Sequence, residues 1–222
     1  PMRPVPQAEG KAILISAARA EAEAAQLVLR PVRPLSGLHV RAGDLVGPGG
    51  ARIPAAAVEI LKVEYVDVDW PTDAAGVGAG RWPDPLLPLP ASLDLESGQN
   101  QPLWIRVTVP AEAEAGTFVG RIHLEAIGYE HSVPLRVEVF DFRLPDRMTC
   151  QTAFGFSPEN VWRYHRLSTE GERRAVLNKY WRSFSAHHIS PYDPAPLDPL
   201  RVTWPDSADL ADGIDFTLNF EW

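Results

Sequence analysis

The chain has 222 residues, 45% of them apolar and seven of them tryptophan. This length and composition allow a substantial hydrophobic core and exclude a disordered chain. The 21 basic and 29 acidic residues give a formal net charge of −8 without a block of like charge, so we expect no binding to nucleic acid or to an anionic membrane. No run of residues has the length of a membrane span, and the N-terminus lacks the apolar stretch of a signal peptide.

The first third of the chain carries two conflicting signals. Residues 17–25 are rich in Ala and Glu, which favours a helix, whereas residues 26–30 followed by Pro31 favour a strand that leaves for a turn. We predict a strand over residues 24–31, with irregular or extended structure before it. A short strand over residues 37–42, a Gly-Pro-Gly-Gly turn at residues 47–50 and a long extended run over residues 58–70 follow.

Residues 81–88 form a proline-rich arm that also carries Trp82 and two leucines. Pro83, Pro85 and Pro88 remove backbone donors and push the preceding residues towards extended geometry, so we expect a stiff arm without regular structure. The apolar side chains of such an arm would be costly in water. We therefore expect the arm to lie on another domain of the chain or on a ligand.

The clearest strands follow the arm. Each of three segments alternates apolar and polar side chains with a period of two, which is typical of a sheet that is packed on one face. With glycine turns between them, they predict that residues 1–145 form an antiparallel β-sandwich domain. The apolar members of the three segments are Leu103, Ile105, Val107 and Val109; Phe118, Ile122 and Leu124; and Val133, Leu135, Val137 and Val139.

The pattern changes after residue 145. Residues 149–156 have the composition of a strand that is buried on both faces, and we expect the lone cysteine, Cys150, to be a small buried residue within it. Thr169 and Glu172 form a capping box, and helical spacing of apolar residues predicts a helix over residues 170–186. A further extended segment follows. The expected order of a strand, a helix and a second strand predicts that residues 146–222 begin an α/β domain, which is incomplete in this chain.

Several segments carry a resemblance to a known family when they are taken in this order. They are Gln26-Leu27-Val28-Leu29-Arg30, Trp82-Pro83-Asp84-Pro85-Leu86, Gly98-Gln99-Asn100-Gln101-Pro102-Leu103-Trp104, Val109-Pro110, Ala115-Gly116-Thr117-Phe118-Val119-Gly120, Val139-Phe140-Asp141-Phe142-Arg143-Leu144-Pro145 and Thr152-Ala153-Phe154-Gly155. The chain resembles glycoside hydrolase family 123 and its uncharacterised relatives. The resemblance implies an N-terminal β-sandwich joined to a (β/α)₈ barrel. It also implies an exo-acting β-N-acetylgalactosaminidase in the intact protein.

The resemblance implies a substrate-assisted, retaining mechanism, in which the 2-acetamido group of the sugar is the nucleophile, an Asp orients it and the adjacent Glu is the general acid and base. No Asp-Glu dipeptide occurs in this sequence. We therefore predict no catalytic residue in this chain and no turnover by the chain alone. The implied partners are a glycan or amino sugar and the missing remainder of the barrel domain.

Candidate sugar-binding residues follow from the barrel expectation, because barrel chemistry sits at the C-terminal ends of the strands. Phe156 follows the first expected strand, and Tyr192 and Asp193 follow the second. Trp82 and Asp84 could reach the barrel mouth from the proline-rich arm. Loop packing is the alternative role for Phe156, Tyr192 and Asp193. Packing at a domain interface is the alternative role for Trp82 and Asp84.

No metal ion or other cofactor is expected. His187 and His188 are adjacent, so on an extended segment they would point to opposite faces, and no third ligand lies at a known spacing. Two other functions stay open. The first is a carbohydrate-binding sandwich without a hydrolase role, and the second is a structural domain whose proline-rich arm only holds its neighbour.

Overall fold

The structure is a computed structural model that describes residues 12–70, 78–147, 149–150, 152, 154–190 and 196–197. The chain divides into two compact units, Pro1–Leu144 and Pro145–Trp222. Within the described residues, no helix is long and apolar enough to cross a membrane.

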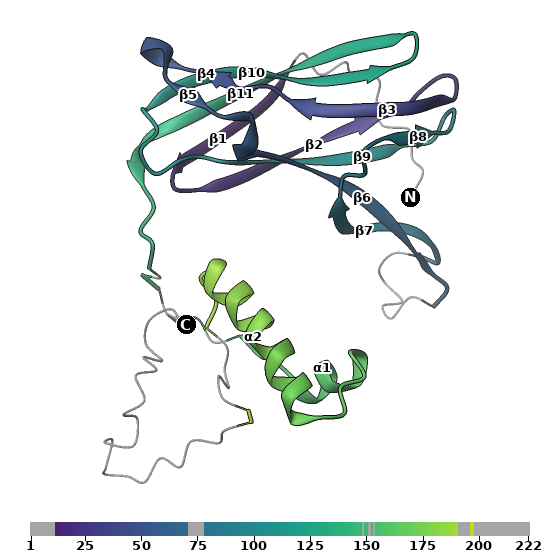
Figure 1. The fold of residues 1–222 in the computed structure, drawn as a ribbon, viewed down its shortest axis with the longest axis vertical. Coiled ribbons are helices and arrows are strands. Elements are labelled where there is room, and N and C mark those ends of the chain that lie inside the picture. The colour runs from purple at the N-terminus through teal and green to yellow at the C-terminus, as the bar shows by residue number, and fades with distance from the viewer. Residues whose placement is uncertain are drawn as a thin grey trace. The chain divides into compact units, whose positions relative to one another are not determined.

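The first unit consists of two β-sheets that face each other (Figure 1). One sheet has the strand order β1-β11-β10-β3-β8, with the short strand β4 paired to β10 and the short strand β5 paired to β4. The other sheet has the order β2-β9-β6-β7. The strands are β1 Ile13–Arg19, β2 Ala22–Leu29, β3 Leu35–Ala42, β4 Leu45–Val46, β5 Arg52–Ile53, β6 Val58–Val68, β7 Gly80–Pro88, β8 Leu93–Leu95, β9 Gln101–Thr108, β10 Gly116–Ala126 and β11 Tyr129–Arg143. This arrangement confirms the predicted β-sandwich.

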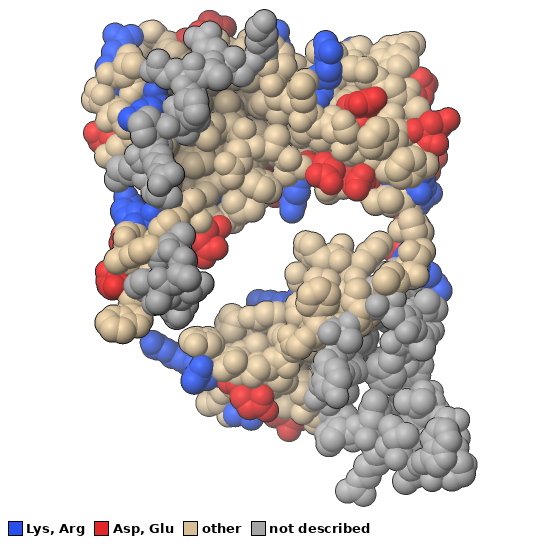
Figure 2. All heavy atoms as spheres, turned by 180° about the vertical axis from the view of Figure 1, so that it is seen from behind, with Lys and Arg blue, Asp and Glu red and all other residues tan. Residues whose placement is uncertain are grey.

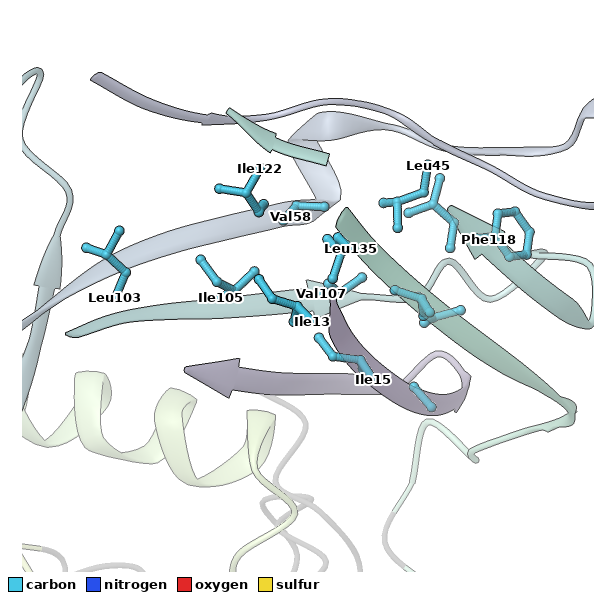
Figure 3. Close-up of a cluster of buried hydrophobic side chains, with 14 of the residues drawn as sticks. Ile13, Ile15, Leu45, Val58, Leu103, Ile105, Val107, Phe118, Ile122 and Leu135 are labelled. Atoms are coloured by element: carbon cyan, nitrogen blue, oxygen red, sulfur yellow. The ribbon is translucent and has the colours of Figure 1, made fainter. Parts of the chain in front are cut away.

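The hydrophobic core lies between the two sheets. Apolar side chains of β6 and β9 point towards those of β1, β4, β10 and β11 (Figure 3). The three alternating segments all form strands, β9, β10 and β11, and their apolar residues are the ones that face the core. Leu103, Ile122 and Val137 are fully buried. The period-two pattern therefore placed these side chains correctly.

The beginning of the chain is more regular than predicted. Residues 22–29 form strand β2, in agreement with the strand predicted over residues 24–31. Residues 13–19, where irregular or extended structure was expected, form strand β1, which pairs in parallel with β11. Ala17 and Ala18 are completely buried, and Ala20 has a positive φ of 64° where the chain turns from one sheet into the other. Small side chains suit this crossing because its residues Ala17 and Ala18 are completely enclosed by the packed core.

The proline-rich arm is a strand, which corrects the expectation that it lacks regular structure. Residues Gly80–Pro88 form β7, which pairs with β6 and ends the four-stranded sheet. Prolines are compatible with an edge strand because one side of the strand needs no ladder hydrogen bonds. The β6–β7 register shifts so that Asp84 and Pro85 together oppose Glu64, which is a β-bulge. The prediction failed because prolines exclude a central strand but not an edge strand, and the local sequence does not show that this strand lies at an edge.

The described part of the second unit contains two helices, α1 Pro158–Tyr164 and α2 Glu170–Ala186. The predicted helix over residues 170–186 is confirmed, and so is its capping box, in which the Thr169 side chain accepts from the Glu172 N–H and Glu172 accepts from the Thr169 N–H. Ser157 caps α1 by accepting from the Asn160 N–H. Both starts follow the usual rule for helix N-termini.

The strand predicted over residues 149–156 is not found in the residues of this segment that the structure describes, which exclude 151 and 153. In the part of this segment that the structure describes, Phe154 forms an isolated bridge and is 56% exposed. Cys150 is exposed, which corrects the expectation of a buried cysteine. A segment of apolar composition becomes a buried strand only where neighbouring strands cover both of its faces. The start of a barrel therefore stays a prediction.

Candidate functional site

Two of the predicted sugar-binding residues, Trp82 and Asp84, lie on strand β7. The indole of Trp82 is half-buried, and its Nε1 donates to the carbonyl oxygen of Gly78 at 3.0 Å. Asp84 is exposed and lies in the β-bulge. A bulge turns side chains away from their regular direction. Trp82 and Asp84 are therefore held on one short edge, the first by a hydrogen bond and the second by the local backbone geometry.

Tyr65 and Asp67 of the neighbouring strand β6 flank this edge and contact Arg81 of β7. The guanidinium of Arg81 lies 5.5 Å from the centre of the Tyr65 ring, and Arg81 Nε lies 3.5 Å from Asp67 Oδ1. The Tyr65 hydroxyl donates to the carbonyl oxygen of Asn100 at 3.4 Å. Burial raises the pKa of Tyr65, and the charge of Arg81 opposes this effect. The tyrosine is therefore a neutral hydrogen-bonding group at physiological pH.

Glu64, opposite the bulge, has a lowered pKa. The main cause is a hydrogen bond from Lys62 Nζ to Glu64 Oε2 at 2.6 Å, followed by the backbone N–H of Tyr65. A carboxylate that is held ionised in this way is a poor general acid. This edge therefore offers stacking and hydrogen bonding, and Glu64 does not have the raised pKa that an acid catalyst requires.

Phe156, the third predicted residue, lies in the second unit against helix α2. Its ring centre lies 5.4 Å from that of Tyr180, 5.0 Å from that of Trp181 and 5.5 Å from that of Phe184. Aromatic pairs at these separations stabilise a fold beyond the area they bury. In this structure Phe156 packs α2 against the segment that precedes α1.

Tyr192 and Asp193 lie outside the described residues. The structure therefore brings Trp82 and Asp84 together on one edge and leaves Phe156 in a separate unit. In the described ranges, no three side chains among His, Cys, Asp and Glu are grouped to hold a metal ion. His187 and His188 lie in the turn after α2, where His187 Nδ1 is 2.6 Å from the carbonyl oxygen of Ser183.

Charge is mixed on the surface of the first unit. In Figure 2, Lys and Arg side chains are interspersed with Asp and Glu side chains over this unit. Several form cross-strand pairs, including Arg106 with Glu59 and Arg41 with Glu125. Exposed pairs of this kind contribute little to stability. The surface shown does not present a continuous patch of one sign.

One feature was missed by the sequence reasoning, a cavity of about 820 Å³ at one end of the sandwich. The sequence contains no local signal for it, because its walls come from segments that are far apart in the chain. The residues around it are Leu27, Val28, Leu29, Arg30, Pro31, Val32, Arg33, Leu35, Leu38, Leu95, Leu124, Tyr129, His131, Ser132, Val133 and Pro134.

Solved structures with a similar fold include a family 123 glycoside hydrolase from Clostridium perfringens, which was studied for glycolipid glycan hydrolysis. Its TM-score is 0.69 at 15% identity, and the match covers 80% of this chain and 33% of that one. This chain therefore spans about a third of the length of that enzyme. The likeness shows a common fold.

Two other solved structures score much lower. PapD-like domain 7 of human CEP192 has a TM-score of 0.30 at 12% identity and covers 62% of this chain and 84% of that one. The N-terminal domain of PorA has a TM-score of 0.29 at 12% identity, with coverage of 60% and 91%. None of the curated proteins compared with this sequence matches it.

A sequence model of a protein family identifies the chain more directly. The glycoside hydrolase 123 N-terminal domain matches residues 2–126, which is more than half of the 222 residues and most of the β-sandwich. The matched range contains the proline-bearing edge strand β7 and the central strand β9, which carry much of the resemblance. The chain belongs to the family of the glycoside hydrolase 123 N-terminal domain.

Proposed function

We propose that this chain is the N-terminal part of a glycoside hydrolase that acts on amino-sugar-containing glycans. Residues 1–145 form its β-sandwich, and residues 146–222 begin its (β/α)₈ barrel. The observation that carries the proposal is the family match over residues 2–126. Because fold alone does not establish function, the activity has to be tested on the protein.

Two observations support the start of a barrel. The first unit holds 144 of 222 residues, or 65%, whereas the likeness to the family 123 enzyme covers 80% of the chain and so extends into the second unit. In that unit the Phe154 N–H donates to the Ser190 carbonyl oxygen at 3.2 Å, and the Ser190 N–H donates to Thr152 Oγ1 at 2.8 Å. The segments before α1 and after α2 therefore lie side by side, as successive strands of a barrel would.

The chemistry that we propose for the intact protein is substrate-assisted hydrolysis of a terminal β-N-acetylgalactosaminide with retention of configuration. The sequence contains no Asp-Glu pair, so the acid and the orienting carboxylate would come from outside these residues. Within the chain, Tyr192, Asp193 and Phe156 are the proposed sugar contacts near the barrel mouth. Trp82 and Asp84 are proposed contacts from the edge strand β7.

The test compares the 222-residue chain with the longest protein that the same gene encodes. Both are assayed with 4-nitrophenyl N-acetyl-β-galactosaminide and with the matching β-galactoside, which lacks the 2-acetamido group. We expect the longer protein to cleave only the acetamido sugar and the 222-residue chain to cleave neither. Cleavage of the plain galactoside at a similar rate would rule out substrate assistance. A longer protein that cleaves neither substrate and has no Asp-Glu pair would overturn the proposal.

A second candidate function, glycan binding by the sandwich itself, is favoured by one specific observation. Phe140 and Phe142 lie on β11 with ring centres 5.7 Å apart and planes within 6° of each other. Their side chains are 39% and 53% exposed. Exposed parallel rings can stack on the apolar face of a sugar.

Titration of the chain with N-acetylgalactosamine-containing oligosaccharides tests this second candidate. The double variant F140A/F142A should lose the binding, and a Tyr164→Ala variant, which removes an aromatic side chain that is 75% exposed in the other unit, should retain it. Equal binding by both variants would mean that the glycan does not bind at Phe140 and Phe142.

A further inference from the structure

The interior of the sandwich is open at one end. Tyr129 and His131 occupy the same face of β11 as Leu135 and Val137, which are buried in the core. Tyr129 is nevertheless 38% exposed, and His131 is exposed as well. Residues that face the core and still contact solvent indicate that the opposite sheet does not cover them. The cavity of about 820 Å³ begins at this uncovered end.

The walls of the cavity are apolar and come from both sheets. Leu27 and Leu29 of β2 belong to one sheet, and Leu38 of β3 and Leu124 of β10 belong to the other. Leu38 and Leu124 are almost completely buried, whereas Leu27 and Leu29 are only partly buried. The volume lies within the range of about 300–1,000 Å³ that is usual for small-molecule sites. An aliphatic ligand in the cavity would bury the partly exposed side chains of Leu27 and Leu29 on β2.

The charged residues around the cavity have one sign. Arg30 and Arg33 lie in the segment that joins β2 to β3, and among the described residues that line the cavity there is no Asp or Glu. Arg30 Nη1 donates to Asn100 Oδ1 at 3.2 Å, which is the oxygen of a neutral amide. A guanidinium prefers a carboxylate, sulfate or phosphate as its partner. The rim is therefore complementary to an anion.

The segment that carries the two arginines is held in place. The Ser97 hydroxyl donates to the carbonyl oxygen of Val32 at 2.9 Å, and the Gly98 N–H donates to that of Pro31 at 2.8 Å. These bonds tie the segment to the turn between β8 and β9. A guanidinium on a fixed backbone loses less conformational freedom when it binds.

We propose that this cavity binds a single-chain amphiphile with an anionic head, of the alkyl carboxylate or alkyl sulfate class, taken up as a free molecule. The alkyl chain lies between the two sheets and the head pairs with Arg30 and Arg33. A sugar fits the walls poorly because they offer few hydrogen-bonding groups. An added peptide strand fits poorly as well, because Pro134 removes a backbone donor from this part of β11. The proposal does not depend on the proposed glycosidase function.

The first experiment titrates the full chain with octanoate, decanoate and dodecanoate below their micellar concentrations, using isothermal calorimetry. We expect the Kd to tighten about fourfold for each added methylene that enters the cavity. Decyl sulfate should bind like decanoate, and decyltrimethylammonium should bind at least tenfold more weakly. A Kd that does not change with chain length, or equal binding of the cationic amphiphile, would overturn the proposal.

The second experiment uses variants. R30E/R33E replaces two exposed side chains and should weaken decanoate binding at least tenfold, while binding of decyltrimethylammonium should increase. The matched control is Arg136→Glu, which changes an exposed arginine on the face of β11 that points away from the core. Leu29→Trp should fill the cavity and abolish binding of both amphiphiles. Unchanged binding in R30E/R33E would overturn the role of the arginines.

Other occupants give different results. A membrane surface would give binding to anionic phosphatidylglycerol vesicles without binding of monomeric dodecanoate. A second copy of the chain would give a concentration-dependent dimer in sedimentation, which R30E/R33E would change and decanoate would not. Either result would overturn the proposal, whereas chain-length-dependent binding to a monomer would support it.

Discussion

The two units of the molecule differ most in their cores. In the sandwich, 19 buried apolar side chains, all within the described residues, form one cluster between two sheets. In the described part of the second unit, the buried apolar side chains are Pro158, Val161, Leu177 and Trp181, supplemented by the partly buried ring of Phe156. Buried apolar area is the main source of folding free energy. The sandwich therefore has a core large enough to stabilise a domain by itself, whereas the helices are stabilised by a few aromatic contacts and by capping.

This difference leads to a general expectation. A substitution in the core of the sandwich should lower the stability of a large cooperative unit, and a substitution at an aromatic residue or a cap in the second unit should act on the helices alone. The following predictions test this separation, in order of decreasing effect.

The largest effect is expected from Phe118→Ala in the sandwich. Phe118 is 1% exposed, and its ring packs so close to Gly47 that a Cβ there would lie 2.5 Å away. Truncation should lower the free energy of unfolding of the sandwich by about 4 kcal/mol, because it removes buried area and leaves a cavity. Urea unfolding followed by circular dichroism at strand wavelengths measures this loss. The control is Val119→Ala, at a side chain that is 45% exposed, and an equal loss there would contradict the prediction.

A smaller and more local effect is expected from Trp181→Ala. Trp181 is 3% exposed and lies against Phe156 and Phe184. Its removal should destabilise the packing of α2 by about 3 kcal/mol. Hydrogen exchange with mass spectrometry should show faster exchange in α1 and α2 and no change in β9 and β10. Faster exchange in the strands as well would mean that the two units unfold together.

The next effect concerns the N-cap of α2. Thr169→Ala removes the oxygen that accepts from the Glu172 N–H at 3.2 Å. Loss of such a cap should cost about 1 kcal/mol. Thermal unfolding of the helices, measured at 222 nm, should shift to lower temperature. The same change at an exposed position within the helix, Asn178→Ala, should have no such effect or a slightly stabilising one, because alanine is a better helix former.

The same cap has a predictable pH dependence. Backbone hydrogen bonds from Thr169 and Ser168, and then the hydroxyls of the same residues, lower the pKa of Glu172 from 4.5 to about 2. Because the folded pKa lies below the unfolded one, the stabilisation is present above about pH 4.5 and is lost as the pH falls towards 2. An NMR titration of the Glu172 carboxyl carbon measures this pKa. In Thr169→Ala it should move back towards 4.5, and a midpoint near 4.5 in the parent protein would contradict the capping geometry.

The smallest effect on stability is expected at the prolines of β7. The double variant P83T/P88T changes two exposed residues of the edge strand, so the free energy of unfolding should change by only about 0.5 kcal/mol. The restored N–H groups make the edge a better template for pairing with other chains. Light scattering should therefore show more self-association. If light scattering shows no more self-association in the variant than in the parent, the prolines do not protect this edge.

The sequence predicted the elements whose signals are local. The alternation in residues 103–109, 118–125 and 133–139 identified β9, β10 and β11, and the Thr169–Glu172 box with its helical repeat identified α2 at its correct ends. For the candidate site it predicted Trp82 and Asp84, and the structure places both on one edge strand. It did not predict the pairing of β7 with β6. Three prolines in nine residues indicate irregular structure unless the strand is known to lie at the edge of a sheet.

The sequence by itself therefore determined that β9, β10 and β11 are strands, that α2 is a helix and which face of these strands is apolar, since these features follow from spacing along the chain. The tertiary structure decided which strands are edges, that β1 pairs in parallel with β11, that Cys150 is exposed, and that a cavity bordered by Arg30 and Arg33 lies between the sheets. The physical reason is that edge position, burial and cavities depend on which distant segments meet, and a local pattern of side chains does not contain that information.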